Sequence, residues 1–258
     1  FFLLLLTQSC VSQNYGFHIP KDSRDQFVRI LQDASLTACF DEKCDTKTFK
    51  SSGSGAVVAA STKGSYVLTA AHVCQVELIN MIRDPSLLEF IKEINIEMKI
   101  VNLAQAKYIA DVISLDESSD MCLLFIENYW NEKGPVKISG AKPFEGERVY
   151  NVAAPVGIFY ENTVPLLEGF YMGNEDLRAY FSIPAMGGSS GSPIFNLRGH
   201  LVGMIHSVNT MFPMVSVSPK YEELKKFIKF NVAADMKEKS SQKQPERVPT
   251  PFMKGLGL

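Results

Sequence analysis

The sequence predicts an all-β fold, either a barrel or a sandwich, followed by a single amphipathic helix. Many short apolar segments rich in β-branched and aromatic residues follow one another through most of the chain, and this pattern is typical of all-β proteins. Turn-forming residues separate the segments at close spacing, as in "STKG" at residues 61–64. Near the C-terminus the apolar period becomes that of a helix. Its stripe consists of Tyr221, Leu224, Phe227 and Ile228.

The composition is that of a globular protein and argues against nucleic-acid binding. With 258 residues, of which 46% are apolar, the chain is long enough for one large domain or two small ones with an ample core. The formal net charge of −2, without a basic stripe, excludes the usual electrostatic footprint of a nucleic-acid-binding protein. After the N-terminus, no apolar run reaches the roughly 18 residues needed to span a membrane.

The N-terminal residues have the pattern of an export signal. Phe1–Leu6 are wholly apolar and are followed by small and polar residues, as at the end of a secretory signal and its cleavage region. We therefore assign residues 1–12 as the remnant of a signal peptide and expect an exported protein, either secreted or in the cell envelope. A lipid on Cys10, which would tether the protein to a membrane, is the alternative.

Four cysteines follow Cys10, and this number suits an exported protein with disulfides. Four cysteines allow three pairings, which the sequence alone leaves open. The residues between Cys39 and Cys44 can form a tight hairpin loop that brings the two thiols together. A bond between Cys74 and Cys122 would complete that pairing, and free, packed thiols are the alternative.

The first half of the chain is expected to contain two short helices and several strands. Residues 21–34 place apolar side chains on a helical period, with Asp22 or Ser23 as the cap, so residues 13–35 are expected to form an N-terminal extension. A second short helix is expected at residues 85–92, with a proline in its first position. Strands are expected at "SGAVVAA", "SYVLTAA", "INIEMKIVNL", "KYIADVISLD" and "MCLLFI".

The second half is expected to continue the β pattern up to the C-terminal helix. Ser218 and Pro219 are a suitable start for that helix. The polar, proline-bearing residues 234–258 predict a disordered tail. Strands are expected at "ERVYNVAAPVG", "LLEGFYMG", "RAYFSIPA", "SPIFNLRGHLVGMIHSV" and "PMVSVS".

Three residue types that can cooperate in nucleophilic catalysis follow the strands in the order His, Asp, Ser. His72 comes at the end of an apolar strand, and Asp120 begins another. The stretch "GGSSGSPIF" at residues 187–195 then places three serines among glycines. A serine hydroxyl needs an adjacent base, and a carboxylate can orient that base. Glycines permit a turn whose amides converge on a developing oxyanion.

Together these motifs resemble the chymotrypsin-like, or trypsin-fold, serine peptidases, especially the bacterial HtrA-type and glutamyl-endopeptidase-type branches. The resemblance is carried by "GSGAVV", "VLTAAHV", "DESSDMCLLFI" and "GSSGSPIFNLRGHLVGMI" and extends from about residue 53 to residue 228. It implies a trypsin-like fold of two six-stranded antiparallel Greek-key barrels with a C-terminal helix. The first barrel would span residues 36–130, and the second, with the helix, residues 131–233. A PDZ domain is not expected.

The resemblance also implies a catalytic triad. Ser190 would be the nucleophile, His72 the general base and then the general acid, and Asp120 the carboxylate that orients the histidine. Asp111 and Asp116 are rival carboxylates that match the family pattern less well.

The resemblance further implies an oxyanion hole and a substrate pocket. The backbone amides of Gly188 and Ser190 would form the hole. The pocket would be formed near Pro184, Ile205 and His206, without a charge at its floor.

In glutamyl endopeptidases a histidine on this strand recognises the acidic side chain of the substrate. His206 lies one position beyond the matching residue of this sequence. A shift of one residue on a strand turns the side chain to the other face. Three interpretations remain open for it. His206 supports Asp120, or a bulge turns it into the pocket, or it has neither role.

The residue before the nucleophile is Ser189, where digestive members of the family have an aspartate. We therefore expect no activation through an ion pair with a new N-terminus.

The expected function is that of a serine endopeptidase acting on polypeptides through an acyl-enzyme. No cofactor is expected, and no metal-binding spacing is found. A non-catalytic binding protein that keeps this fold is the main alternative. A hydrolase of esters is a second alternative, although its usual Gly-x-Ser-x-Gly elbow belongs to an α/β pattern that this sequence lacks. The sequence does not indicate an oligomeric state.

Overall fold

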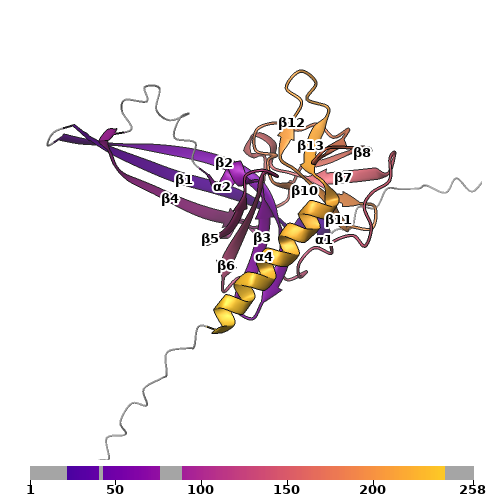
Figure 1. The fold of residues 1–258 in the computed structure, drawn as a ribbon, viewed down its shortest axis with the longest axis horizontal. Helices are drawn as coiled ribbons and strands as arrows, with labels where there is room; N and C mark the ends of the chain where they lie inside the picture. Colours follow the sequence, from indigo (N-terminus) through magenta and orange to yellow (C-terminus); the bar gives the residue numbers. More distant parts are fainter. Residues whose placement is uncertain (1–21, 41–42, 76–88, 242–258) are drawn as a thin grey trace, which may run out of the picture.

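The protein consists of a closed β-barrel, a curled second β-sheet and a long C-terminal helix (Figure 1). The structure is a computed structural model, and it describes residues 22–40, 43–75 and 89–241. The all-β fold with a C-terminal helix is confirmed. The predicted signal remnant at residues 1–12 lies outside the described residues.

The first sheet closes on itself with the strand order β1-β2-β3-β6-β5-β4, and β4 pairs back onto β1. Its interior is filled by side chains that are fully buried, among them Ile30, Val67, Ile100 and Leu124. The strands are β1 (Phe27–Phe40), β2 (Lys43–Ser61), β3 (Gly64–Thr69), β4 (Ile91–Val101), β5 (Lys107–Asp116) and β6 (Met121–Glu127).

Three of these strands continue beyond the barrel and form a projecting arm (Figure 1). Strand β2 pairs with β3 only over residues 56–61, and β4 pairs with β5 only over residues 98–101. Both strands stay paired with β1 farther out. A disulfide between Cys39 and Cys44 joins β1 to β2 at the tip, as the hairpin interpretation predicted.

The second sheet has seven strands in the order β11-β10-β7-β8-β9-β13-β12. It differs from the predicted six-stranded barrel because β11 and β12, which follow each other in the chain, lie at opposite ends of the sheet order. The strands are β7 (Arg148–Val152), β8 (Leu166–Glu175), β9 (Arg178–Phe181), β10 (Ser192–Asn196), β11 (Leu201–Ile205), β12 (Ser207–Val208) and β13 (Ser216–Pro219).

The helix predicted for residues 21–34 is wrong except for its first turn. Only α1 (Asp22–Asp25) is helical, and β1 begins at Phe27. From Val28 the buried positions alternate along the chain, and the strand pairs with β2 on one side and β4 on the other. Pairing on both sides decides the conformation over local periodicity. The first barrel therefore starts at Phe27 rather than at residue 36.

The helix predicted for residues 85–92 falls largely outside the described residues. Its last two positions belong to β4, which starts at Ile91.

The C-terminal helix α4 (Tyr221–Ser241) contacts both sheets and is longer than predicted. We expected it on the second sheet alone. It contacts β2, β5 and β6 of the barrel as well as β11 of the second sheet, and it lies diagonally across them (Figure 1). No helix within the described residues is long and apolar enough to cross a membrane.

A buried polar cluster extends α4 beyond residue 234, where we expected disorder to begin. The Tyr66 hydroxyl donates to Asp235 Oδ2 at 2.7 Å, and Lys239 Nζ lies 2.7 Å from the same oxygen. Burial and the neighbouring carboxylate raise the pKa of Tyr66 above its ordinary value, so the phenol stays a donor. The helix is therefore anchored to the barrel by its last turns.

Candidate active site

His72 lies on a single helical turn, α2 (Ala71–Cys74), that directly follows strand β3. The neighbouring side chains of Ala71, Val73 and Cys74 are buried and hold the turn against the barrel, whereas the His72 side chain is 40% exposed. The turn therefore presents the imidazole at the surface of a rigid support.

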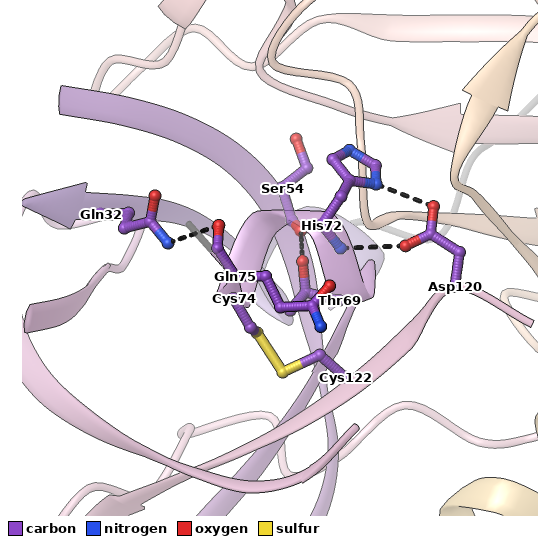
Figure 2. Close-up of a disulfide and its surroundings, with 8 residues drawn as sticks. All are labelled: Gln32, Ser54, Thr69, His72, Cys74, Gln75, Asp120 and Cys122. Atoms are coloured by element: carbon purple, nitrogen blue, oxygen red, sulfur yellow. Dashed lines mark hydrogen bonds and ion pairs between the residues drawn. A yellow bond between two sulfur atoms is a disulfide. The ribbon is translucent and has the colours of Figure 1, made fainter. Parts of the chain in front are cut away.

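Asp120 binds His72 twice (Figure 2). Its Oδ2 lies 2.8 Å from His72 Nδ1, and its Oδ1 accepts the His72 backbone N–H at 3.0 Å. Asp120 ends the turn between β5 and β6 and has a φ of 51°, a left-handed conformation that aspartate tolerates better than most residues. This contact fixes the imidazole with Nδ1 as the donor and leaves Nε2 free to accept a proton.

The two rival carboxylates lie elsewhere. Asp116 Oδ1 accepts the backbone N–H and the hydroxyl of Ser118, so this carboxylate stabilises its own turn. Asp111 is an exposed residue of β5, where it pairs with Phe125. The structure therefore brings only Asp120 of the three to His72.

A disulfide between Cys74 and Cys122 fastens the two segments that carry this pair (Figure 2). Cys74 ends the turn that carries His72, and Cys122 is the second residue of the strand that follows Asp120. The pairing that we considered from the sequence is the one present.

His206 contacts the same oxygen of the Asp120 carboxylate as the His72 ring does. Its Nδ1 is 3.5 Å from Asp120 Oδ2, and its side chain is only 13% exposed. Burial acts to raise the pKa of Asp120, but contacts with His206 and His72 outweigh it and lower that pKa well below its ordinary value. The carboxylate is therefore ionised throughout the neutral range.

The residues expected near a substrate pocket take different positions. His206 contacts Asp120 and also lines the cleft between the two sheets. Ile205 is buried in the core of the second sheet, and Pro184 is half-buried in the segment before the serine turn. A pocket role for Ile205 is therefore restricted to its backbone.

The three serines of the turn have different surroundings. Ser189 Oγ accepts the Met186 amide at 3.4 Å, and Ser192 Oγ accepts the side-chain amide of Asn151 at 2.8 Å. Both serines are buried. Ser190 is partly exposed, and its hydroxyl makes no hydrogen bond to any described residue. Of the three, only Ser190 has a free hydroxyl.

Backbone contacts hold Ser190 beside the segment that leads to His72. The Ser54 amide donates to the Ser190 carbonyl, and the Gly191 amide donates to the Ile205 carbonyl, both at 2.7 Å. A Cβ atom at Gly191 would overlap Ser54 and Thr69, two residues of the barrel. Only glycine therefore allows the turn to seat against the barrel this closely.

The amides of Gly188 and Ser190 are directed away from internal partners. The Val156 amide donates to the Gly187 carbonyl at 2.7 Å. Because the peptide is planar and trans, the Gly188 N–H points the opposite way. Within the described residues, neither the Gly188 nor the Ser190 amide donates a hydrogen bond. Two free amides on one turn can bind an oxyanion.

Val156, which braces this turn, has a strained backbone. Its φ of 45° and ψ of 28° lie in the left-handed region, which β-branched residues rarely adopt. Its side chain is 67% exposed. The strained backbone therefore goes with an amide directed at the Gly187 carbonyl and not with a packed side chain.

A cleft of about 1210 Å³ extends from the His72–Asp120 pair between the barrel and the second sheet. It is lined by both histidines of the site, by Leu115 on the barrel side and by Leu177 and Tyr180 on the other. Among the described residues, no group of three or more potential ligands could hold a metal ion.

Sequence reasoning missed Ser54 and Val156. The "GSG" at residues 53–55 contained the first signal, because a polar residue between two glycines in an apolar strand indicates a close approach of backbones. Nothing in "APVGI" indicated the left-handed valine.

Comparisons with known proteins agree with this geometry. The family described as trypsin-like peptidase domain matches residues 53–204. The crystal structure of the Rv3671c protease from M. tuberculosis, in its active form, is similar in fold, with a TM-score of 0.54, 14% sequence identity and 80% of each chain covered. No curated protein matches the chain.

Proposed function

Because the chain belongs to the family of trypsin-like peptidases, we propose that it is a serine endopeptidase that uses Ser190, His72 and Asp120. Two observations carry this proposal. Asp120 binds both the ring and the backbone of His72, at 2.8 and 3.0 Å, and Ser190 alone of the turn serines has a free hydroxyl. Such a pair supplies the oriented base that a serine nucleophile needs.

The first half of the reaction acylates the enzyme. Ser190 Oγ attacks the carbonyl carbon of the scissile peptide bond while His72 Nε2 takes the hydroxyl proton. The carbonyl oxygen becomes an oxyanion that accepts hydrogen bonds from the Gly188 and Ser190 amides. The imidazolium then gives its proton to the leaving amine as the C–N bond breaks, and an ester with Ser190 remains.

The second half restores the enzyme. A water molecule attacks the ester carbonyl and gives a proton to His72, and the second tetrahedral adduct uses the same two amides. The proton returns to Ser190 Oγ as the acid product leaves. Asp120 stays ionised throughout and stabilises the imidazolium. His206, which contacts the same carboxylate oxygen as the His72 ring, would help to hold Asp120 in place.

The test uses covalent labelling and proteolysis together. A fluorophosphonate should label the wild-type protein at Ser190, and unfolded casein should be cleaved. Ser190→Ala should abolish both. Ser207→Ala, which changes an exposed serine of the same cleft, should leave both within about twofold. A folded protein that is neither labelled nor active would favour the alternative of a binding protein that keeps the fold.

We also propose that the protein is exported, on the basis of its N-terminal pattern and its two disulfides. The substrate would then be a polypeptide outside the cytosol. Free thiols can be alkylated in intact cells before lysis. Mass spectrometry should then find all four of these cysteines oxidised and none of them alkylated. Reduced cysteines in the native protein would contradict an oxidising location.

A further inference from the structure

Ser54 lies at the point where the barrel meets the serine turn. It belongs to β2, and its side chain is fully buried. A Cβ atom at Gly53 would come within 2.7 Å of Val73, and one at Gly55 within 2.9 Å of the Leu68 carbonyl. The neighbouring glycines therefore let this stretch of strand sit against both the His72 turn and β3. Figure 2 shows Ser54 close to that turn.

All three polar groups of Ser54 are hydrogen bonded, and together they make four hydrogen bonds. Its hydroxyl donates to the Gly188 carbonyl at 2.7 Å and accepts the Ala154 amide at 3.0 Å. Its own amide donates to the Ser190 carbonyl at 2.7 Å, and its carbonyl accepts the Thr69 hydroxyl at 2.8 Å. One residue thus joins the barrel, the loop after β7 and both residues whose amides form the proposed oxyanion hole.

The Ser54 hydroxyl holds the carbonyl of the peptide bond between Gly188 and Ser189. Gly188 has a φ of 94° and, having no Cβ, can adopt other conformations at little cost. Val156 holds the peptide before Gly188, whereas Ser54 holds the carbonyl of the peptide after it. With both neighbouring peptides held, the φ and ψ of Gly188 are fixed, and so is the direction of its N–H.

We propose that Ser54 is a positioning residue of the oxyanion hole, acting through its hydroxyl on the Gly188 carbonyl. The proposal rests on the proposed serine peptidase function. Without the hydroxyl, the Gly188 carbonyl and the Ala154 amide would lose a buried partner, and the turn could rotate the Gly188 amide out of the hole. The transition state would then lose an interaction that the bound substrate does not use.

The test is Ser54→Ala, measured on a peptide substrate and with a peptide aldehyde. The aldehyde forms a hemiacetal on Ser190 whose oxygen occupies the hole. We expect kcat to fall about 10- to 100-fold, somewhat less than the about 100- to 1000-fold that removal of a whole oxyanion donor costs. KM should change by less than about threefold, and aldehyde affinity should fall in parallel with kcat.

Ser65→Ala is the matched control. Ser65 is also fully buried in the barrel, and its hydroxyl also donates to a backbone carbonyl, that of Tyr129, at 2.7 Å. It should lower the melting temperature by a similar amount and leave kcat within about twofold. The proposal is overturned if Ser54→Ala keeps kcat and aldehyde affinity, or if both variants lose activity only in proportion to their lost stability.

Two structural measurements decide the question without reliance on turnover. In a crystal structure of Ser54→Ala combined with Ser190→Ala, the Gly188 carbonyl should leave its wild-type direction, and an unchanged turn would overturn the proposal. This holds even if the wild type proves inert, an outcome that would overturn only the proposed function. If Ser54→Ala does not fold, the wild-type complex with the aldehyde serves instead. Its hemiacetal oxygen should lie within hydrogen-bond distance of the Gly188 amide while the Ser54 contact persists, and an oxygen elsewhere overturns the proposal.

Discussion

Cys74 is bonded to Cys122, and each cysteine lies two residues after a member of the His72–Asp120 pair. The bond therefore closes a small cycle of covalent and hydrogen bonds around the proposed catalytic pair. The orientation of the imidazole depends on this cycle and on two contacts with one carboxylate.

Removal of this disulfide should reduce stability and activity together. For the double variant Cys74→Ala/Cys122→Ala we expect a loss of about 2–4 kcal/mol in the free energy of unfolding, and a lower kcat at temperatures where the protein is still folded. The double variant Cys39→Ala/Cys44→Ala, at the tip of the arm, should keep its kcat. Denaturant unfolding measures the loss of stability, and peptide hydrolysis measures the loss of kcat. If the two double variants lost kcat equally, the Cys74–Cys122 bond would have no particular role in orienting His72.

Asp120→Asn should reduce kcat by about 10⁴-fold, because an amide no longer selects the tautomer with Nε2 free. It should also change the dependence of stability on pH. The pKa of Asp120 in the folded protein lies below its ordinary value of 3.8, so its carboxylate stabilises the folded state above that value, and this contribution is lost as the pH falls below it. The difference in free energy of unfolding between wild type and variant should therefore be constant above about pH 5 and shrink below about pH 4. A difference that grew on acidification would contradict the assignment.

His206→Ala should lower kcat on substrates of all kinds, because it removes a third contact of the Asp120 carboxylate, at 3.5 Å, beside the two with His72. We expect about a 3- to 30-fold loss, less than for a residue of the triad itself. Cleavage-site profiling on a peptide library checks this directly. A changed preference for the residue before the scissile bond, with kcat maintained on the best substrate, would assign His206 to the pocket instead.

Val156→Asn should stabilise the protein by about 1 kcal/mol, because asparagine adopts the left-handed conformation at lower cost than a β-branched residue. Its side chain is 67% exposed, so little burial is lost, and its amide still donates to Gly187. Activity should therefore be maintained. Val156→Pro, whose ring fixes φ at roughly −65° and which has no N–H, cannot adopt this backbone and should lower both the melting temperature and kcat. Thermal unfolding and steady-state kinetics separate the two effects.

Asp235→Ala should release the end of α4. It removes the partner of both the Tyr66 hydroxyl and the Lys239 ammonium group, which lies 3.1 Å from the centre of the Phe125 ring. We expect a loss of about 1–3 kcal/mol in the free energy of unfolding. Glu238→Ala, on the exposed face of the same helix, should change it by less than about 0.5 kcal/mol. Equal effects would show that the buried cluster does not anchor the helix.

The chemistry of the site could be predicted from sequence because its residue types are rare in combination. The order of His72, Asp120 and Ser190, with glycines around the serine, selected one family and its roles. For His206 the side-chain period of a strand only favoured contact with Asp120, and three interpretations stayed open. The residues that position the turn could not be found this way. Ser54 acts through contacts with residues 100 and more positions away, and no local pattern reports such contacts.

The fold was predicted well where local and tertiary preferences agree. The β1 segment shows the opposite case, because its apolar residues fit a helical period over a few turns, yet pairing with β2 and β4 makes it a strand. The end of α4 is a second case in which tertiary contacts override the local sequence pattern. Residues 235–239 are mostly polar and suggest disorder, but Asp235 binds the Tyr66 hydroxyl, and Lys239 pairs with Asp235 over the Phe125 ring of the barrel. One partner of β1, the strand β4, and both barrel residues that hold the end of α4 lie far away in sequence.

The division of the site between two sheets also sets the order in which a nascent chain acquires activity. Synthesis proceeds from the N-terminus, and domains tend to fold as they emerge. The pair formed by His72 and Asp120 can assemble once the barrel strands up to residue 127 have left the ribosome. The serine turn must wait for β11, because the Gly191 amide is held by Ile205. A chain that has folded only its barrel thus contains the proposed base and its carboxylate but no seated nucleophile, so the proposed site is complete only after the second sheet has formed.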